Sequence, residues 1–186
     1  MCLRSVFMFS LINAFYIHQF HQLENDQVED YYWADYKGII PEDALSAGYI
    51  PANETTYYIA EVLHKNSLVP GEIHDSDKKA YYEWANERLE ATGNVKIFCT
   101  KRPQMFQWIQ TTNEDFKTLI EGNLVLGKYE SDTRIYIGRK QIANNVVIGK
   151  VHVVLPDLKG IFYYLFGEDV FFSYSFEVLS YLQDNL

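Results

Sequence analysis

The chain has 186 residues, of which 48% are hydrophobic and 16% aromatic, and its formal net charge is −9 at pH 7. This composition is typical of a folded chain, either one domain or two small halves that share a core, and excludes a disordered one. The sequence has no cluster of Lys and Arg that would bind nucleic acid, and no apolar run of about 18 residues that would span a membrane. Its two cysteines, Cys2 and Cys99, cannot form a disulfide framework, and no C-x-x-C pair predicts zinc. We expect Cys99 to be a buried strand residue, and we expect no metal and no cofactor.

The N-terminal residues 1–17 have two interpretations. Arg4 precedes an apolar run that ends at the small residue Ala14, which is the pattern of a short secretory signal peptide. The same residues also suit an apolar N-terminal strand or helix. Asn53 begins an Asn-Glu-Thr triplet in a predicted loop and is a candidate glycosylation site, which favours a secreted location over a cytoplasmic one. Residues 18–32 are polar and acidic and are predicted to be a linker.

A hairpin-like segment occurs twice in the chain. In the first copy Tyr58 precedes Gly71 by 13 residues, and in the second copy Tyr136 precedes Gly149 by the same 13 residues. Each tyrosine opens an apolar run, a polar break follows, and each glycine lies in a second apolar run. A spacing that is shared across a polar linker indicates a duplicated hairpin.

The match between the two copies extends in both directions. Each copy opens near a tryptophan, Trp33 or Trp108. The aligned segments are 39–48 with 118–127, 84–87 with 165–168, and 95–98 with 176–179. The chain is therefore predicted to contain two diverged repeats of roughly 75 to 80 residues, 33–100 and 103–183.

Within the repeats the apolar residues recur with a period close to two, which predicts strands. Two stretches, 76–90 and 114–121, contain helix-forming residues, although the repeat alignment favours a strand at 80–85. The predicted fold is all-β, with the two repeats packed as a pseudo-twofold β-sandwich or barrel-like single domain. The predicted strands are 56–62, 68–73, 80–85, 94–100, 133–140, 146–155, 161–166 and 172–182.

Five short motifs follow one another along the two repeats. They are Pro41-Glu42-Asp43-Ala44-Leu45-Ser46-Ala47-Gly48-Tyr49, Val69-Pro70-Gly71, Tyr136-Ile137-Gly138-Arg139, Phe166-Gly167-Glu168 and Phe176-Glu177-Val178-Leu179. Their order resembles the DM-nine repeat family over roughly residues 31–183. The resemblance implies an all-β, non-catalytic, mannose-binding lectin used in pathogen recognition and innate immunity, which can form a homodimer. It also implies a sugar held by an aspartate after an Ala-Gly-Tyr step and by the lysine of Pro-Gly-Lys.

The first repeat departs from the family pattern at three positions. Ile50 stands where the aspartate is expected, Glu72 where the lysine is expected, and Glu61 where an arginine is expected. Isoleucine can neither accept nor donate a hydrogen bond, and a glutamate reverses the charge of a lysine. We therefore predict that the first-repeat sugar site is degenerate.

The second repeat keeps more of the pattern. It retains Arg139 and Lys150, and its aspartate position aligns with Tyr129, with Glu130 one residue along. These four residues are the candidate ligand-binding residues, because vicinal sugar hydroxyls need both carboxylate acceptors and cationic donors. Trp108 or Tyr129 is a candidate for stacking on a sugar face.

Each candidate cation also has a structural alternative. Lys150 suits a solvated lysine at the end of a hairpin. Arg139 suits an ion pair with Glu168 or Glu177, which lie in the motifs that follow.

Two function classes remain open. The first is a carbohydrate-binding protein with a mannose-type glycan as its partner. The second is a protein-interaction scaffold without sugar binding, with another protein as its partner, which the 15 tyrosines also suit. An enzyme is not expected and no catalytic residue is proposed, because the chain has no G-x-S-x-G, no H-E-x-x-H and no glycine-rich phosphate loop.

Overall fold

The computed structural model describes residues 31–52, 54–120, 122–130 and 133–182. The predicted signal segment 1–17, most of the predicted linker 18–32 and the glycosylation candidate Asn53 lie outside the described residues. Cys99 is fully buried in a strand, as predicted.

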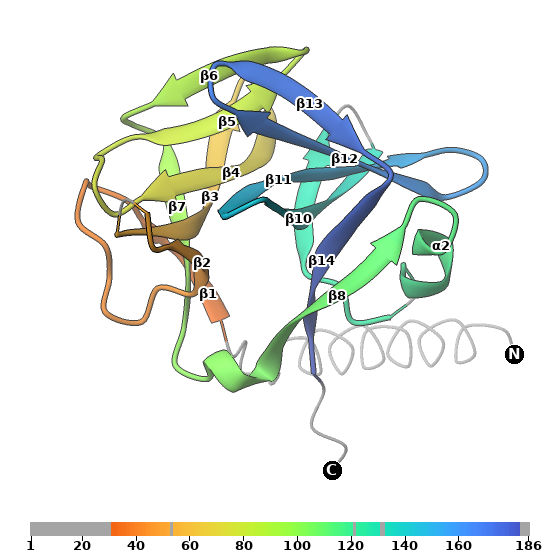
Figure 1. Cartoon of the computed structure of the whole chain (residues 1–186), viewed down its shortest axis with the longest axis horizontal. Coiled ribbons are helices and arrows are strands. Elements are labelled where there is room, and N and C mark those ends of the chain that lie inside the picture. The colour runs from red at the N-terminus through yellow and green to blue at the C-terminus, as the bar shows by residue number, and fades with distance from the viewer. Residues whose placement is uncertain (1–30, 53, 121, 131–132, 183–186) are drawn as a thin grey trace, which may run out of the picture. The chain divides into compact units, whose positions relative to one another are not determined.

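The first repeat forms a seven-stranded antiparallel sheet (Figure 1). Its strands follow the order β1-β7-β3-β4-β5-β6, and β2 pairs with β3. The strand β1 begins at Tyr31, so the predicted linker overlaps its first two residues. The strands are β1 (Tyr31–Asp35), β2 (Ser46–Ile50), β3 (Thr55–His64), β4 (Ser67–His74), β5 (Ala80–Trp84), β6 (Glu87–Ala91) and β7 (Val95–Thr100).

The second repeat forms a second seven-stranded sheet with the same connectivity. Its order is β8-β14-β10-β11-β12-β13, and β9 pairs with β10, so every strand has a counterpart in the first sheet. The described part of the chain also contains a 3₁₀ turn η1 (Pro103–Met105) and a short helix α2 (Phe116–Leu119). The strands are β8 (Phe106–Thr112), β9 (Leu126–Glu130), β10 (Thr133–Ile142), β11 (Asn145–Val154), β12 (Lys159–Phe166), β13 (Asp169–Ser173) and β14 (Ser175–Tyr181).

The predicted all-β fold of two tandem repeats is confirmed. Neither described sheet closes on itself, so the arrangement is two packed open sheets and not a barrel. The contacts between the sheets are reciprocal, as a pseudo-twofold axis requires: β4 contacts β9 and β11, while β11 contacts β2 and β4. Figure 1 shows β6 and β13 side by side at one end of this junction.

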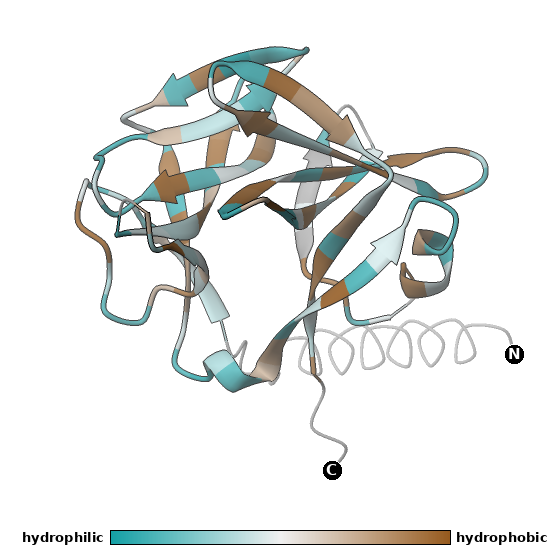
Figure 2. Cartoon of the chain, viewed as in Figure 1, coloured by the Kyte–Doolittle hydropathy of each residue, from teal (hydrophilic) through white to brown (hydrophobic). Residues whose placement is uncertain are grey.

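The core is divided into three hydrophobic clusters. One belongs to the first repeat, one to the second, and the third is shared between them. The shared cluster includes Ile59 and Phe98 of the first repeat and Ile137, Ile148 and Leu179 of the second, all at most 1% exposed. Figure 2 shows hydrophobic residues along the strands of both sheets and mostly hydrophilic residues in the turns. The repeats are therefore fixed against each other by a common core.

Three stretches correct or refine the predicted elements. The predicted strand 172–182 is divided at Tyr174 into the end of β13 and the start of β14. The stretch 76–90 contains β5 and β6 and no helix, because Ala85 and Asn86 adopt positive φ (53° and 64°) and turn the chain back as a hairpin. The stretch 114–121 contains α2, as its composition suggested.

The structure corrects the repeat alignment by one residue in two segments. Gly71 lies opposite Tyr82 and Gly149 opposite Tyr164, so Trp84 corresponds to Phe166 and not to Leu165. The upstream segment is shifted in the same way, since Ser46 pairs with Tyr58 and Leu126 pairs with Tyr136, so Ser46 corresponds to Leu126 and not to Val125.

The upstream correction changes the candidate site. Ile50 pairs with Thr55 at the start of β3, and Glu130 pairs with Thr133 at the start of β10. The residue that corresponds to Ile50 is therefore Glu130, and the sequence alignment with Tyr129 was wrong.

The glycine that ends each duplicated spacing has a steric role. A Cβ on Gly149 would collide with the backbone carbonyl oxygen of Tyr163, and a Cβ on Gly71 would collide with that of Tyr81. In both repeats the neighbouring strand passes directly over the glycine. The 13-residue spacing found in the sequence thus marks the same close strand contact in both sheets.

We expect Gly149→Ala to lower the free energy of unfolding by about 1–3 kcal/mol, because β12 must move away to admit the methyl group. Urea denaturation measures this change. The matched control is Gly93→Ala, which meets no atom within 4 Å and should change the free energy by less than about 0.5 kcal/mol. Equal losses in the two variants would contradict a steric role for this glycine.

Candidate functional site

Lys150 is buried at the junction of the two repeats. It lies within β11, is 4% exposed, and its Nζ is 2.6 Å from Oε2 of Glu130 and 2.9 Å from Oε2 of Glu83. Glu130 ends β9 of the same repeat, whereas Glu83 comes from β5 of the first repeat. The alternative of a solvated lysine at a hairpin end is therefore wrong. Both repeats contribute a carboxylate to one ammonium group.

Glu83 is held by the turn that follows it. Its side chain is 6% exposed, and Oε1 accepts a hydrogen bond from the backbone N–H of Asn86 at 2.7 Å. Its other oxygen, Oε2, is buried and contacts Lys150 as an ion pair without the direction of a hydrogen bond. The turn fixes this carboxylate against the ammonium group, so two carboxylates share one lysine.

Aromatic rings border the charged group. Nζ of Lys150 lies 5.6 Å from the ring centroid of Trp84, the residue after Glu83. The ring of His64 packs on the same indole, with 4.7 Å between ring centroids. The geometry of Lys150 over Trp84 is within the range of a cation–π contact.

The pKa values of His152 and Tyr163 are shifted by burial and by the charges of the Lys150 cluster. Burial lowers the pKa of His152, and the positive charge of Lys150 lowers it further against the opposing effect of Glu130 and Glu83. His152 is thus neutral at pH 7. Burial, followed by the charge of Glu83, raises the pKa of Tyr163, which pairs with Lys150 across the sheet.

His152 makes the protein sensitive to acid. Its pKa in the folded state is below the ordinary value of about 6.5, so the unfolded chain binds more protons below that pH. The contribution of His152 to stability is therefore constant above about pH 6.5 and falls as the pH drops below it. We expect the free energy of unfolding to fall less steeply between about pH 7 and pH 5 in His152→Gln than in the wild type. Urea denaturation at each pH measures the slopes, and equal slopes would contradict this role.

Arg139 is engaged in structural contacts. Its Nε and Nη2 donate to the two oxygens of Glu177 at 2.8 and 3.1 Å, and Nη1 donates at 2.7 Å to the carbonyl oxygen of Ala47 in the first repeat. The guanidinium group also lies over Trp108, 4.5 Å from the ring centroid. Of the two proposed ion-pair partners, Glu177 is confirmed, whereas Glu168 is 3.4 Å from Arg88.

Glu61 stands at the position that corresponds to Arg139. It is 3% exposed and lies opposite Lys96 in the register, as Arg139 lies opposite Glu177. The Nζ of Lys96 is 3.1 Å from Asp35. The same cross-strand position therefore carries charges of opposite polarity in the two repeats.

Glu72 stands at the position that corresponds to Lys150, and it also acts across the junction. It is 6% exposed, its Oε2 accepts a hydrogen bond from the backbone N–H of Ile148 at 3.2 Å, and its Oε1 is 3.1 Å from Nε2 of His74. His74 itself corresponds to His152. Ile50, which is 2% exposed, stands where the second repeat has Glu130.

The surroundings of Glu72 differ from those of Lys150. Glu72 borders a cavity of about 270 Å³ between the repeats. Leu165 and Phe166 line this cavity at the positions that correspond to Glu83 and Trp84. The first-repeat position therefore has neither an ammonium group nor the two flanking carboxylates.

Sequence reasoning missed Glu83, Trp84 and His152. The alignment, which was out by one residue at β5, gave Glu83 no relation to Lys150. One signal was present, since a glutamate interrupts the apolar run of β5 at a position where β12 has Leu165. Tyr129, a predicted site residue, lies in β9 opposite Arg134.

The described residues contain neither a metal-binding cluster nor a membrane-spanning helix. In that part of the chain, no group of three or more His, Cys, Asp and Glu is placed to hold a metal ion. The described helices include none that is long and apolar enough to cross a membrane.

Comparison with known proteins gives a family and a similar fold. The model of the DM9 repeat matches residues 13–91 and 55–169. No curated protein matches the chain. Among solved structures, the nematode sperm cell motility protein MFP2B is similar with a TM-score of 0.55 and 9% sequence identity, over 84% of this chain and 46% of that protein. The chain thus spans less than half of that protein's length, and the likeness concerns the fold alone. Because the two matches of the family model together cover most of the chain, the chain belongs to the DM9 repeat family.

Proposed function

We propose that the protein is a non-catalytic, lectin-like carbohydrate-binding protein whose site is built by Lys150, Glu130, Glu83 and Trp84. Membership of the DM9 repeat family supports carbohydrate binding as the general function. A mannose-type glycan is the ligand class that we propose, with a role in pathogen recognition. The first-repeat position around Glu72 is proposed to be degenerate, and Arg139 is assigned a structural role.

One observation carries the proposal: a buried ammonium group is held by two carboxylates beside an indole ring. The distances from Nζ to the two carboxylate oxygens are 2.6 and 2.9 Å. The charges of Lys150, Glu130 and Glu83 add to −1. Burying these three charged groups costs more free energy than burying apolar side chains of similar size would. A structural role alone gives little reason to keep it.

The chemistry of the cluster suits a sugar. Carboxylate oxygens accept hydrogen bonds from vicinal hydroxyl groups, and the ammonium group donates to hydroxyl oxygens. Trp84 offers an apolar face for the C–H groups of a pyranose ring. Glu130 has the more accessible carboxylate, since its side chain is 16% exposed and that of Glu83 is 6% exposed. We therefore assign the direct sugar contact to Glu130 and the orientation of Lys150 to Glu83.

The test is binding of the purified full chain to immobilised glycans. We expect mannose-type glycans to bind, and we expect Glu130→Gln to weaken binding by about tenfold or more, because a charged hydrogen-bond acceptor is lost. The control Glu90→Gln changes a carboxylate that is 50% exposed and pairs with Lys79, outside the site, and should bind as the wild type does. Absence of glycan binding by folded protein, or binding that is unchanged in Glu130→Gln, would overturn the proposed site.

Protein binding is the second candidate function, and a specific surface favours it. The edge strand β13 and the residue after it expose Phe171, Phe172 and Tyr174, at 42%, 57% and 52%. Exposed aromatic side chains on the outer strand of a sheet are typical of surfaces that contact another protein. If no glycan binds, we expect the wild type to self-associate, as measured by sedimentation, and the Phe172→Ser variant to self-associate less. Wild-type and Phe172→Ser protein that are equally monomeric would exclude a homodimer through this edge.

A further inference from the structure

A cavity of about 700 Å³ lies in the first repeat and is lined by first-repeat residues. Its walls come from the end of β1 and the following turn, from β3, and from the turn between β6 and β7. The residues that line it include none of the Lys150 cluster. It is therefore separate from the proposed glycan site.

Comparison of the repeats shows that the core beside this space has smaller side chains in the first repeat. In the second repeat three fully buried phenylalanines, Phe116, Phe162 and Phe176, pack together with 5.8 to 6.0 Å between ring centroids. The register shows that Phe162 corresponds to Ala80 and Phe176 corresponds to Val95. Two large rings of the second repeat are thus replaced by small side chains in the first.

Phe116 packs over Gly160, where an added Cβ would lie 2.7 Å from the ring. Lys78 occupies the position of Gly160 in the first repeat, and its aliphatic part lies over Gly38, with an added Cβ 3.3 Å from it. Lys78 and Val95 both line the cavity, beside the buried ring of Tyr36. The residues that line the cavity at these two positions thus differ from those that fill the core of the second repeat.

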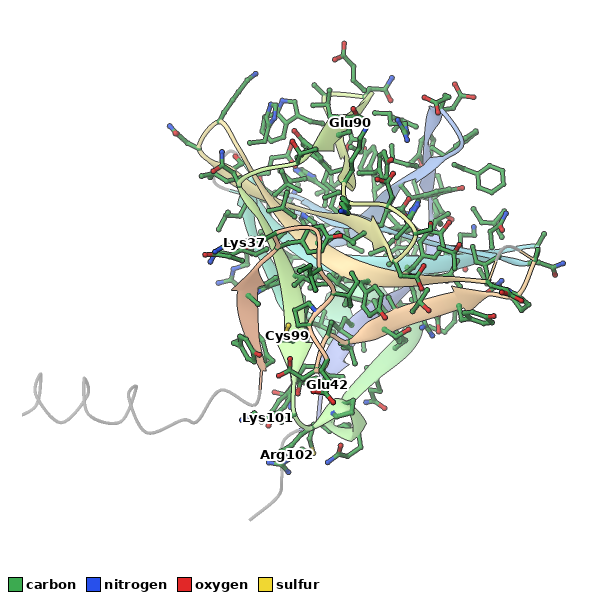
Figure 3. All side chains as sticks on the ribbon, turned by 90° about the vertical axis from the view of Figure 1, so that its left-hand side faces the viewer. Lys37, Glu42, Glu90, Cys99, Lys101 and Arg102 are labelled. Carbon is green, nitrogen blue, oxygen red and sulfur yellow. The ribbon has the colours of Figure 1, made fainter. Side chains whose placement is uncertain are left out.

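The cavity has an apolar wall and a basic rim. Leu63 and Leu68 line it together with Val95. Lys37 and Lys78 also line it, and within the described part of the chain neither of these lysines forms an ion pair. Figure 3 shows Lys37 in the turn after β1, far from Lys101 at the opposite end of the sheet.

The other charged residues that line the cavity are Lys96 and two acidic residues near it, Asp35 and Glu61. Lys96 is 3.1 Å from Asp35 and lies opposite Glu61 in the register. The five charged residues that line the cavity, three lysines and two acids, give it a net charge of +1 in a protein of net charge −9. A local positive site on an acidic protein favours an anion over a cation.

We propose that this cavity binds a small amphipathic anion, with its apolar body against Leu63 and Leu68 and its anionic group between Lys37 and Lys78. The volume is within the range of about 300–1,000 Å³ that is usual for small-molecule sites. A mainly apolar wall with a few charged groups is also usual for such sites. The ligand class is an aromatic or aliphatic carboxylate, sulfonate or phosphate monoester.

The test compares two fluorescent probes with the full chain. One is 8-anilinonaphthalene-1-sulfonate, and the other is the neutral N-phenyl-1-naphthylamine, which has the same apolar body without the anionic group. We expect saturable binding of the sulfonate, and binding about tenfold weaker in the double variant Lys37→Gln with Lys78→Gln. The control Lys101→Gln removes an exposed charge outside the cavity and should leave binding unchanged.

A second variant tests the apolar wall. Leu63 is 48% exposed, so Leu63→Trp narrows the cavity without disturbing the core and should weaken binding of both probes. The neutral probe should be insensitive to the lysine substitutions. The proposal is overturned if folded wild-type protein shows no saturable binding of the sulfonate, or if the double lysine variant and Lys101→Gln bind it equally. It is also overturned if the Leu63→Trp variant binds both probes as the wild type does.

Discussion

Lys150→Ala is expected to lower the free energy of unfolding by about 3–5 kcal/mol, the largest effect of any single substitution considered for this protein. The ammonium group neutralises Glu130 and Glu83, at 2.6 and 2.9 Å. Its removal leaves two carboxylates close together at a site from which water is largely excluded. Each then keeps its cost of desolvation without the attraction that offset it.

Urea denaturation at neutral pH measures this loss against a matched control. Lys79 is also 2.9 Å from a glutamate, Glu90, but the two side chains are 39% and 50% exposed. Exposed pairs contribute little, so Lys79→Ala should change the free energy of unfolding by less than about 1 kcal/mol. A similar small loss in Lys150→Ala would contradict the view that the junction is dry.

A triple variant separates the charge from the packing of the lysine stem. Replacing Lys150 by Met and both Glu83 and Glu130 by Gln removes all three charges and keeps similar volumes. We expect this variant to recover most of the stability that Lys150→Ala loses, because neutral groups replace the buried charges. Glycan binding should remain absent in the stable triple variant. The triple variant would thus separate the effect of these three residues on stability from their effect on glycan binding.

The repeated hairpin could be predicted because one steric requirement occurs twice. Gly71 and Gly149 lie under the neighbouring strand, so the glycine and its spacing from Tyr58 or Tyr136 are retained while most other residues have changed. The central strands of each sheet could also be predicted, because they are long and their apolar residues recur with a period close to two. The outer strands were missed, because a half-exposed strand such as Glu87–Ala91 shows little apolar periodicity.

The composition of the site could be predicted only in part. Lys150 and Glu130 were found because they lie in recognisable motifs of one repeat. Glu83 was not, because its contact with Lys150 depends on how the two sheets pack, which the pattern of a single repeat does not contain. The connection between β2 and β3 is two residues longer than that between β9 and β10, and the sequence alignment allowed for a difference of one, which placed Tyr129 where Glu130 belongs.

Arg139→Ala is expected to lower the free energy of unfolding by about 2–3 kcal/mol, because it removes two charge-assisted hydrogen bonds within the second repeat and one that reaches the first repeat. The guanidinium group binds both oxygens of Glu177 and also the carbonyl oxygen of Ala47. Its side chain is 24% exposed, so solvent replaces these contacts poorly. Arg139→Lys should be almost as destabilising, since an ammonium group cannot make the same planar, bidentate contact.

Arg88 provides the matched control for this prediction. Its guanidinium group also covers an aromatic ring, 4.4 Å from the centroid of Tyr81, and its side chain is also 24% exposed. Its partner Glu168, however, is 86% exposed at a distance of 3.4 Å. Arg88→Ala should therefore cost less than about 1 kcal/mol. If Arg139→Ala costs no more than this control, its contacts with Glu177 and Ala47 do not stabilise the fold as proposed.

Glycan binding by Arg139→Lys distinguishes a structural role from a ligand-binding one. The guanidinium group is occupied by Glu177 and Ala47, and it covers Trp108, the other candidate for stacking on a sugar face. Below its unfolding transition, the folded Arg139→Lys variant should therefore bind mannose-type glycans as the wild type does. Loss of binding by a variant that is still folded would return Arg139 and Trp108 to the site and move it away from Lys150.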